Sequence, residues 1–322
     1  MNEHTNLLEI KDLTVHYVTV DGTVHAVENL NLTLPEGKTL GLVGETGAGK
    51  TTTVKAIMQI LPDPPAKILT GEVIFCGEDL LKKNKKSMRK IRGKQISMIF
   101  QDPMTSLNPV ITVGEQIMEV IRLHDKKISK KDAYTKACEM LELVGIKADR
   151  AGDYPHQFSG GMKQRVIIAM ALACNPRLLI ADEPTTALDV TIQAQILHLL
   201  LELQKKNNMS IILITHDLGV VAQTCKRVAV MCGGYVVEEG TVEEIFLHPG
   251  HPYTQALIAS MPRVGGTFEQ FLERDLSDGN GDLCPFLNRC KYADKTCEAC
   301  LPKYYEASEG HRIFCHRREE KR

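Results

Sequence analysis

Residues 39–57 read TLGLVGETGAGKTTTVKAI, and this stretch decides the fold that we expect. The apolar run TLGLVG has the continuous hydrophobic character of a strand buried on both faces of a parallel sheet. Glycines follow at once, and from Thr51 the residues read as a helix that Pro62 ends. A strand, a glycine-rich loop and a helix in direct succession predict a loop that holds phosphate groups.

The loop matches G-x-x-x-x-G-K-[ST], the P-loop pattern. Its glycines let backbone N–H groups approach phosphates, Lys50 adds positive charge, and the Thr51 hydroxyl is placed to bind Mg²⁺. The start of the following helix also favours anions, whereas a glycine turn that only caps a helix is the ordinary alternative. The expected nucleotide-binding residues here are Gly44, Glu45, Thr46, Gly47, Ala48, Gly49, Lys50, Thr51 and Thr52.

The segments on either side of this loop predict an α/β fold. Residues 7–18 and 28–34 alternate apolar and polar side chains, as half-buried antiparallel strands do. Further on, the apolar strands LLIAD and IILIT enclose a helix-like segment, and alternating strands and helices indicate a parallel sheet. Helical spacing at 113–148 and 161–174 predicts a mostly helical insertion.

The end of this region is marked by turn residues. VAVMCGGYVVEEGT predicts a hairpin that turns at Gly233 and Gly234, and HPGHPYTQAL predicts a linker that runs into a short helix. We therefore place the main domain boundary near residue 240.

LLIADEP supplies a second half for the phosphate site. Asp182 ends the strand, where its carboxylate can hold Mg²⁺ through the water shell of the ion. Glu183 follows, and its carboxylate can accept a proton from the attacking water as general base. A DE pair after an apolar strand is commonplace by itself. Paired with the P-loop, it predicts a nucleotide hydrolase.

Composition narrows the function classes. The formal charge of −1, with 39 basic against 40 acidic residues, gives no field that gathers nucleic acid. MNEHTNLLEIKDLTV lacks the basic start and apolar run of a signal peptide, and no run of about 18 apolar residues occurs, so we expect a cytosolic protein. In that compartment the ten cysteines indicate reduced thiols or metal ligands rather than disulfides.

FSGGMKQR, at 158–165, resembles the LSGGQ signature of the ABC ATPases. Ser159, Gly160 and Gly161 offer a hydroxyl and exposed N–H groups to anionic oxygen at a helix start. The resemblance implies that this surface contacts the ATP held by the opposite subunit. Met162 stands where the usual signature has Gln, a departure that leaves the hydroxyl and the glycines intact.

Other motifs of this family follow in the expected order. Tyr17 resembles the aromatic that stacks on adenine, and Gln101 resembles the Q-loop residue that reaches the metal ion and the attacking water. Ala187-Leu188-Asp189 resembles the D-loop, and His216 the histidine that hydrogen-bonds the γ-phosphate. Each residue alone has an ordinary alternative as a strand aromatic, a loop amide, a helix cap or an imidazole at a strand end.

The resemblance implies the architecture and the enzyme class. We expect a P-loop NTPase (RecA-like) core with an antiparallel β subdomain and a helical ABC subdomain at about 102–165, all within an ATPase domain at 1–240. A C-terminal extension, residues 241–322, follows. The implied activity is ATP hydrolysis, with Mg²⁺ bound by Thr51, Gln101 and Asp182.

FQDPMTSLNP, HPYTQAL and the cysteine-bearing tail together resemble the ATPases of dipeptide and oligopeptide importers. That resemblance implies a peripheral protein on the cytoplasmic face of the membrane, with two permease subunits and a second, similar ATPase or a second copy of this chain. The resemblance also implies an extracytoplasmic peptide-binding protein that delivers the solute. The main alternative to a peptide importer is a related importer for nickel or another solute. Two further alternatives are a non-transport ABC ATPase and a regulatory metal-binding module.

The last forty residues are chemically distinct. Cys284, Cys290, Cys297 and Cys315 resemble the ligands of the 4Fe-4S cluster of this family, and four thiolates suit that cluster. They also suit tetrahedral Zn²⁺, and Cys300 forms a Cys-x2-Cys pair of common zinc spacing with Cys297. The resemblance favours the cluster and leaves Cys300 free. The stretch has few large apolar residues, so a metal staple of structural role explains how it folds.

Overall fold

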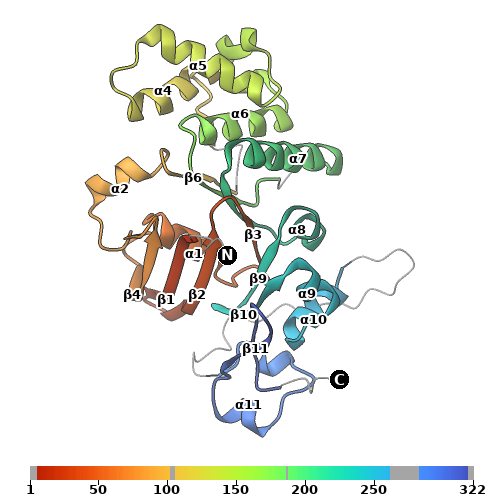
Figure 1. Cartoon of the computed structure of the whole chain (residues 1–322). Coiled ribbons are helices and arrows are strands. Elements are labelled where there is room, and N and C mark those ends of the chain that lie inside the picture. The colour runs from red at the N-terminus through yellow and green to blue at the C-terminus, as the bar shows by residue number, and fades with distance from the viewer. Residues whose placement is uncertain (1–5, 102–105, 186–187, 262–282, 318–322) are drawn as a thin grey trace. The chain divides into compact units, whose positions relative to one another are not determined.

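The computed structural model describes residues 6–101, 106–185, 188–261 and 283–317 (Figure 1). The chain forms two compact units, which are described separately. The first takes in residues 1–35, 39–82 and 213–322, and the second takes in 36–38 and 83–212. Within the described ranges, no helix has both the length and the apolar character needed to cross a membrane.

The first unit contains an antiparallel sheet in the order β2-β1-β4-β5. Its strands are β1 (Asn6–Thr19), β2 (Gly22–Pro35), β4 (Ala66–Phe75) and β5 (Glu78–Asp79). Alternate residues such as Leu13, Val15 and Leu30 are completely buried, which is the pattern expected when one face of a sheet packs against a core. The predicted antiparallel strands at the start of the chain are confirmed.

A second group of strands in this unit runs in the order β11-β12-β10-β9-β3. The strands are β3 (Thr39–Val43), β9 (Arg227–Cys232), β10 (Tyr235–Thr241), β11 (Tyr304–Ser308) and β12 (His311–Phe314). β3 is buried along its whole length and pairs in parallel with β9, as its apolar run predicts. The hairpin between β9 and β10 turns at Gly233 and Gly234, both with positive φ, so that prediction is also confirmed.

The helices of the first unit are short. They are α1 (Lys50–Ile57), α8 (Leu218–Thr224), α9 (Val242–Leu247), α10 (Pro252–Ala259), α11 (Lys295–Ala299) and the 3₁₀ turn η3 (Leu287–Arg289). α10 is the short helix predicted from HPYTQAL. The domain boundary that we predict near residue 240 falls at the end of β10 and stays a prediction.

The second unit combines three strands with a helical region. The strands, in the order β8-β7-β6, are β6 (Ile96–Ile99), β7 (Leu178–Asp182) and β8 (Ser210–Ile214, whose last residues belong to the first unit). The helices are α2 (Lys85–Ile91), α4 (Val113–His124), α5 (Lys130–Leu143), α6 (Gly160–Leu172) and α7 (Val190–Asn207), with 3₁₀ turns η1 (Ala148–Gly152) and η2 (Pro155–Gln157). Figure 1 shows α4, α5 and α6 packed on one another. Helices are present in both segments where helical spacing predicts them, 113–148 and 161–174. The helical subdomain with bounds at about 102–165 stays a prediction, and residues 102–105 lie outside the described residues.

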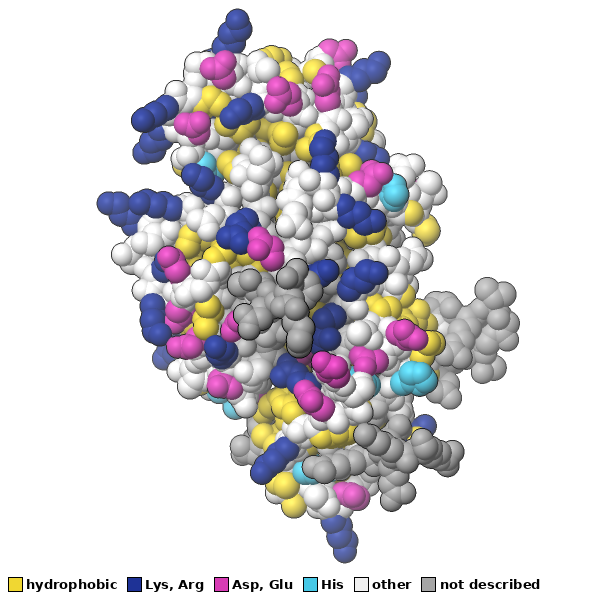
Figure 2. Space-filling view, viewed as in Figure 1, with side chains coloured by type: hydrophobic (Ala, Val, Ile, Leu, Met, Phe, Trp, Pro, Cys, Tyr) yellow, Lys and Arg dark blue, Asp and Glu magenta, His cyan; other side chains and the backbone are white. Residues whose placement is uncertain are grey.

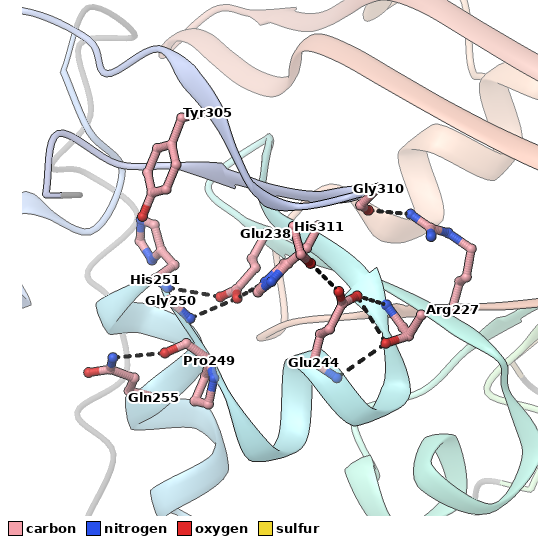
Figure 3. Close-up of polar contacts among 12 residues, drawn as sticks. Arg227, Glu238, Glu244, Pro249, Gly250, His251, Gln255, Tyr305, Gly310 and His311 are labelled. Carbon is pink, nitrogen blue, oxygen red and sulfur yellow. Dashed lines mark hydrogen bonds and ion pairs between the residues drawn. The ribbon is translucent and has the colours of Figure 1, made fainter. Parts of the chain in front are cut away.

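Buried carboxylates of β10 fasten the C-terminal segments to the first unit (Figure 3). The Glu238 side chain is fully buried and accepts hydrogen bonds from the backbone N–H groups of Gly250 (2.8 Å) and His251 (2.9 Å). The His311 imidazole of β12 contacts the same carboxylate at 2.7 Å. A buried charge is tolerated only when such partners surround it, so Glu238 links three segments that are distant in sequence.

Candidate functional site

The loop between β3 and α1 needs glycine for reasons of space as well as chemistry. A Cβ atom on Gly44 would lie 2.1 Å from the Met231 carbonyl oxygen, and one on Gly49 would lie 2.2 Å from that of Ala26. Both glycines also have positive φ, 147° and 102°. Any side chain at either position would therefore displace the loop.

The remaining loop residues present an exposed tip and a fixed lysine. Thr46 and Gly47 are exposed, whereas Ala48 is buried. Lys50 is only 7% exposed, and its Nζ donates to the carbonyl oxygens of Gly44 and Glu45, both at 2.7 Å. The loop thus concentrates positive charge and backbone N–H groups at the first turn of α1, an arrangement suited to polyphosphate.

The first turn of α1 carries the two threonines predicted from the motif. Thr51 and Thr52 are partly exposed there. The Tyr17 hydroxyl lies 3.3 Å from the Thr52 hydroxyl, so the structure brings together the predicted adenine-stacking residue and the phosphate loop. Tyr17 belongs to β1, which explains how a strand far earlier in the chain takes part in this loop.

One polar cluster at the loop was not predicted from the sequence. The Glu45 backbone N–H donates to the Tyr253 hydroxyl at 3.0 Å, and the Glu45 carboxylate forms an ion pair with Arg289 at 2.8 Å. Arg289 also lies over the Phe286 ring, 5.1 Å from its centre. The C-terminal segment is therefore in direct contact with the phosphate-binding loop. No local pattern signals a pair whose members are 244 residues apart.

The predicted catalytic carboxylates lie at the end of β7 in the second unit: Asp182 is its last residue, and Glu183 follows it. Asp182 is 2% exposed. Glu183 has a φ of 49°, in the left-handed region that non-glycine residues rarely adopt. The Gln101 side-chain amide donates to the Glu183 carboxylate at 3.1 Å. Two residues predicted separately, from the Q-loop resemblance and from the strand end, are therefore in contact.

The signature segment begins α6, as its serine and glycines predict. Ser159 is the N-cap of α6, and its hydroxyl accepts the Met162 N–H at 3.4 Å. A Cβ atom on Gly161 would lie 2.6 Å from Cγ2 of Ile192 on α7, whereas one on Gly160 would make an ordinary 3.6 Å contact with Leu188. Gly161 therefore allows α6 and α7 to pack closely.

The D-loop match is only partly described. Ala187 lies outside the described residues, and Asp189 is the exposed N-cap of α7, whose carboxylate accepts the Ile192 N–H at 2.9 Å. The helix-cap explanation of Asp189 thus holds whether or not it has a further role. His216 follows β8 as an exposed residue, just before Asp217, the N-cap of α8.

Gln164 is a further residue that the motif search did not single out. It is completely buried in α6, and its amide donates to the Pro184 carbonyl oxygen at 2.5 Å. Pro184 follows Glu183 directly, so Gln164 positions the turn that carries the predicted general base. The sequence feature that could have drawn attention to Gln164 is its place inside the signature segment FSGGMKQR.

The four cysteines predicted as metal ligands line one cavity in the first unit, together with His251 and Phe286; they are Cys284, Cys290, Cys297 and Cys315. Cys300 is exposed and is not among the lining residues. Burial raises the pKa of the Cys284 thiol to about 11, and the neighbouring cysteines act in the same direction. The cavity therefore disfavours the charged form of the Cys284 thiol.

Comparison with known proteins shows the family of this chain. A family model described as ABC transporter matches residues 27–186, and a second, described as oligopeptide/dipeptide transporter, C-terminal region, matches 237–297. The chain is 52% identical to the oligopeptide transport ATP-binding protein OppD of Bacillus subtilis (strain 168), over 96% of this chain and 88% of that protein. The chain belongs to the ABC transporter family, in its oligopeptide and dipeptide branch.

Further relatives agree with this membership of the ABC family. The dipeptide transport ATP-binding protein DppD of Bacillus subtilis (strain 168) is 49% identical over 96% of this chain and 94% of that protein. Among solved structures, the dimeric ATP-binding cassette MJ0796 in a post-hydrolysis state with ADP and phosphate gives a TM-score of 0.66 at 29% identity, covering 73% of this chain and 98% of that one. The ABC ATPase fold expected from the signature segment is confirmed.

Proposed function

We propose that this chain binds and hydrolyses ATP to energise the import of dipeptides or oligopeptides through separate membrane subunits. The observation that carries this function is the contact between the Gln101 amide and the Glu183 carboxylate. It holds a potential general base beside a residue that can follow the metal ion and the attacking water. The oligopeptide and dipeptide transport relatives supply the class of solute.

The proposed catalytic roles divide between metal binding and proton transfer. Mg²⁺ would be held by the Thr51 hydroxyl, the Gln101 amide and, through water, Asp182. Glu183 accepts the proton of the attacking water, and His216 hydrogen-bonds the γ-phosphate. Lys50 and the loop N–H groups neutralise the negative charge of the phosphates. The protein therefore catalyses hydrolysis mainly by positioning the reacting groups and by stabilising the charge of the transition state.

The remaining ATP contacts come from Tyr17 and from a partner subunit. Tyr17 stacks on adenine. Ser159, Gly160, Gly161 and Asp189 of one subunit act on the ATP held by the other, and the partner is a second, similar ATPase or a second copy of this chain. The dimeric solved structure of the relative MJ0796 supports this arrangement. Within the chain, we propose an ATPase domain at 1–240 with a helical subdomain from about 102 to 165, and an extension at 241–322.

Two permease subunits would complete the transporter, with this chain attached at the cytoplasmic face of the membrane and an extracytoplasmic binding protein supplying peptide. Nucleic acid is not a proposed partner. Figure 2 shows basic and acidic side chains interspersed on the face that it draws. The near balance of 39 basic and 40 acidic residues supports this choice, because nucleic-acid binding favours a strongly basic domain.

For the tail cavity we propose a 4Fe-4S cluster rather than a single zinc ion. Cys284, Cys290, Cys297 and Cys315 line this cavity together, and four thiolates suit such a cluster. Their order resembles that of the cluster ligands of this family, and for that reason we prefer the cluster to tetrahedral Zn²⁺. The cluster would act as a structural staple for the extension.

The metal is tested by composition. Anaerobic purification of the full chain should give a brown protein that contains iron and acid-labile sulfide. A colourless protein with one equivalent of zinc would contradict the cluster.

The function is tested by purification of the tagged chain from the membranes of its own cell in mild detergent. Two permeases and a second ATPase in stoichiometric amounts are the expected result, and the associated binding protein would then identify the solute. Soluble nucleoprotein partners without a permease would overturn the proposal.

A further inference from the structure

Three side chains on β1 and β2, none of which lines the cysteine cavity, point toward one another. His16 and His25 are direct cross-strand partners, with ring centres 4.2 Å apart. His16 Nε2 lies 2.5 Å and His25 Nδ1 lies 2.6 Å from the same oxygen, Oε1 of Glu28. One potential ligand atom from each residue lies within 4.8 Å of the other two.

The chemistry of these three atoms suits a cation. Two imidazole nitrogens and one carboxylate oxygen form a donor set that zinc, nickel and copper favour, whereas Mg²⁺ and Ca²⁺ prefer oxygen ligands alone. The exposed fractions of the side chains are 14% for His16, 15% for Glu28 and 35% for His25. The carboxylate is thus partly removed from water, while the His25 side leaves room for a solvent ligand.

The backbone around the three residues is fixed. The strand register shifts between Val15 and His16, an irregularity of the kind that re-aims side chains beside functional sites. The Glu28 N–H donates to the Gly234 carbonyl oxygen at 3.0 Å, which attaches β2 to the turn between β9 and β10. A site built on paired strands with such support needs only small side-chain movements to reach ligand distances of about 2.0–2.1 Å.

We propose that His16, His25 and Glu28 bind one divalent transition-metal ion, represented by Zn²⁺. The two imidazole nitrogens that now share the Glu28 oxygen would bind the cation together with the carboxylate, and any proton on either nitrogen would be released to solvent. Such sites commonly have three protein ligands and one water.

The proposed metal site adjoins the phosphate-binding loop. Tyr17 follows His16 and contacts Thr52, and Ala26 follows His25 with its carbonyl oxygen against Gly49. A bound ion would therefore bias the strand positions that contact the loop, and the metal and the nucleotide would alter each other's affinity equally. This linkage rests on the proposed ATP binding, whereas the metal site does not.

Metal binding is measured on the full chain with Co²⁺ and Zn²⁺. We expect wild type to bind one more equivalent of Co²⁺ than His16→Gln, His25→Gln or Glu28→Gln. The absorption spectrum of this additional Co²⁺ should lack the thiolate charge-transfer band of a cysteine site. His198→Gln is the matched control, because His198 pairs with Glu202 on an exposed helix surface. Zn²⁺ should raise the unfolding temperature of wild type and of His198→Gln more than that of His25→Gln.

Equal stoichiometry in wild type and all three site variants would overturn the site. If one variant fails to fold, the other two variants and the thermal shift still test the metal site.

The linkage between metal and nucleotide is tested separately. Mg–ATP affinity is compared with and without Zn²⁺ in wild type and His25→Gln, in the same solutions. A several-fold change confined to wild type is expected. Normal ATP binding with no zinc effect would overturn the linkage alone, and absence of ATP binding would count against the proposed function instead.

Discussion

Glu183 occupies backbone that a glutamate rarely adopts. Its φ of 49° has a cost of roughly 1–3 kcal/mol for a non-glycine residue, so its surroundings must hold it there. The buried Asp182 before it and the Gln164 contact to Pro184 after it provide that support. In this backbone conformation the Glu183 carboxylate accepts a hydrogen bond from the Gln101 side-chain amide.

Replacing Glu183 by Gln should leave ATP binding intact and lower turnover by roughly 10²–10⁴-fold, because the amide cannot accept the proton of water. The ATP-bound dimer should accumulate as a result. Phosphate release and light scattering measure the two effects, with the exposed Glu202→Gln as control. Near-normal turnover would remove Glu183 from this role.

At the residue scale, sequence reasoning finds groups that a contiguous motif holds together. Lys50, Asp182 and Glu183 could be named because a loop or a strand end fixes their place. Gln164 could not, because its partner is the carbonyl oxygen of Pro184, twenty residues away, and a backbone acceptor leaves no pattern of residue types.

At the scale of elements, two adjacent glycines of α6 differ in how closely they pack against neighbouring side chains. Gly161→Ala would push a methyl group to 2.6 Å from Ile192 and separate α6 from α7. We expect a loss of roughly 1–3 kcal/mol in the free energy of unfolding. Gly160→Ala is the matched control, because its methyl group fits at 3.6 Å and alanine stabilises a helix. Equal effects on urea unfolding would contradict this packing.

The start of α10 depends on a neutral histidine. Burial lowers the pKa of His251 to about 4, and its Nδ1 accepts the Tyr253 N–H at 3.0 Å as N-cap. The unfolded chain binds a proton here below about pH 6.5, whereas the folded chain does so only near pH 4. The contribution of the neutral His251 to the free energy of unfolding is therefore fully present above pH 6.5. Between pH 6.5 and pH 4 it falls by about 1.4 kcal/mol per pH unit as the pH decreases.

His251→Asn keeps an N-cap and removes the titration. Between pH 7 and pH 5, wild type should lose about 2 kcal/mol more unfolding free energy than this variant. The exposed His248→Asn serves as control and should follow wild type. Parallel pH dependence of wild type and His251→Asn in urea titrations would refute the assignment.

At the scale of the whole molecule, the C-terminal extension and the phosphate loop are joined by the Arg289–Glu45 ion pair, whose side chains are 16% and 19% exposed. Arg289→Gln would leave the Glu45 charge uncompensated near the phosphates. We expect ATP affinity to fall about fivefold, roughly 1 kcal/mol. Glu45→Gln in the same chain should restore it. An ATP dissociation constant unchanged in Arg289→Gln would show that the pair has no influence on the nucleotide.

Strand segments along the chain and the family could be predicted because strand patterns and motifs are local in sequence. How the extension attaches could not. The Glu238 carboxylate contacts Gly250 and His251 from one segment and His311 from another. The sequence, a run of two glutamates, does not indicate that the Glu238 side chain is fully buried. Long-range polar contacts of this kind become visible only in the folded chain.

ATP-driven uptake tests the central claim most directly. The complex purified through this chain would be placed in liposomes with Mg–ATP inside, and the binding protein with labelled peptide outside. Peptide should accumulate inside with wild type and remain at the background level with Glu183→Gln. Accumulation that is the same with Glu183→Gln, or no uptake by a complex that hydrolyses ATP and binds peptide, would contradict the account.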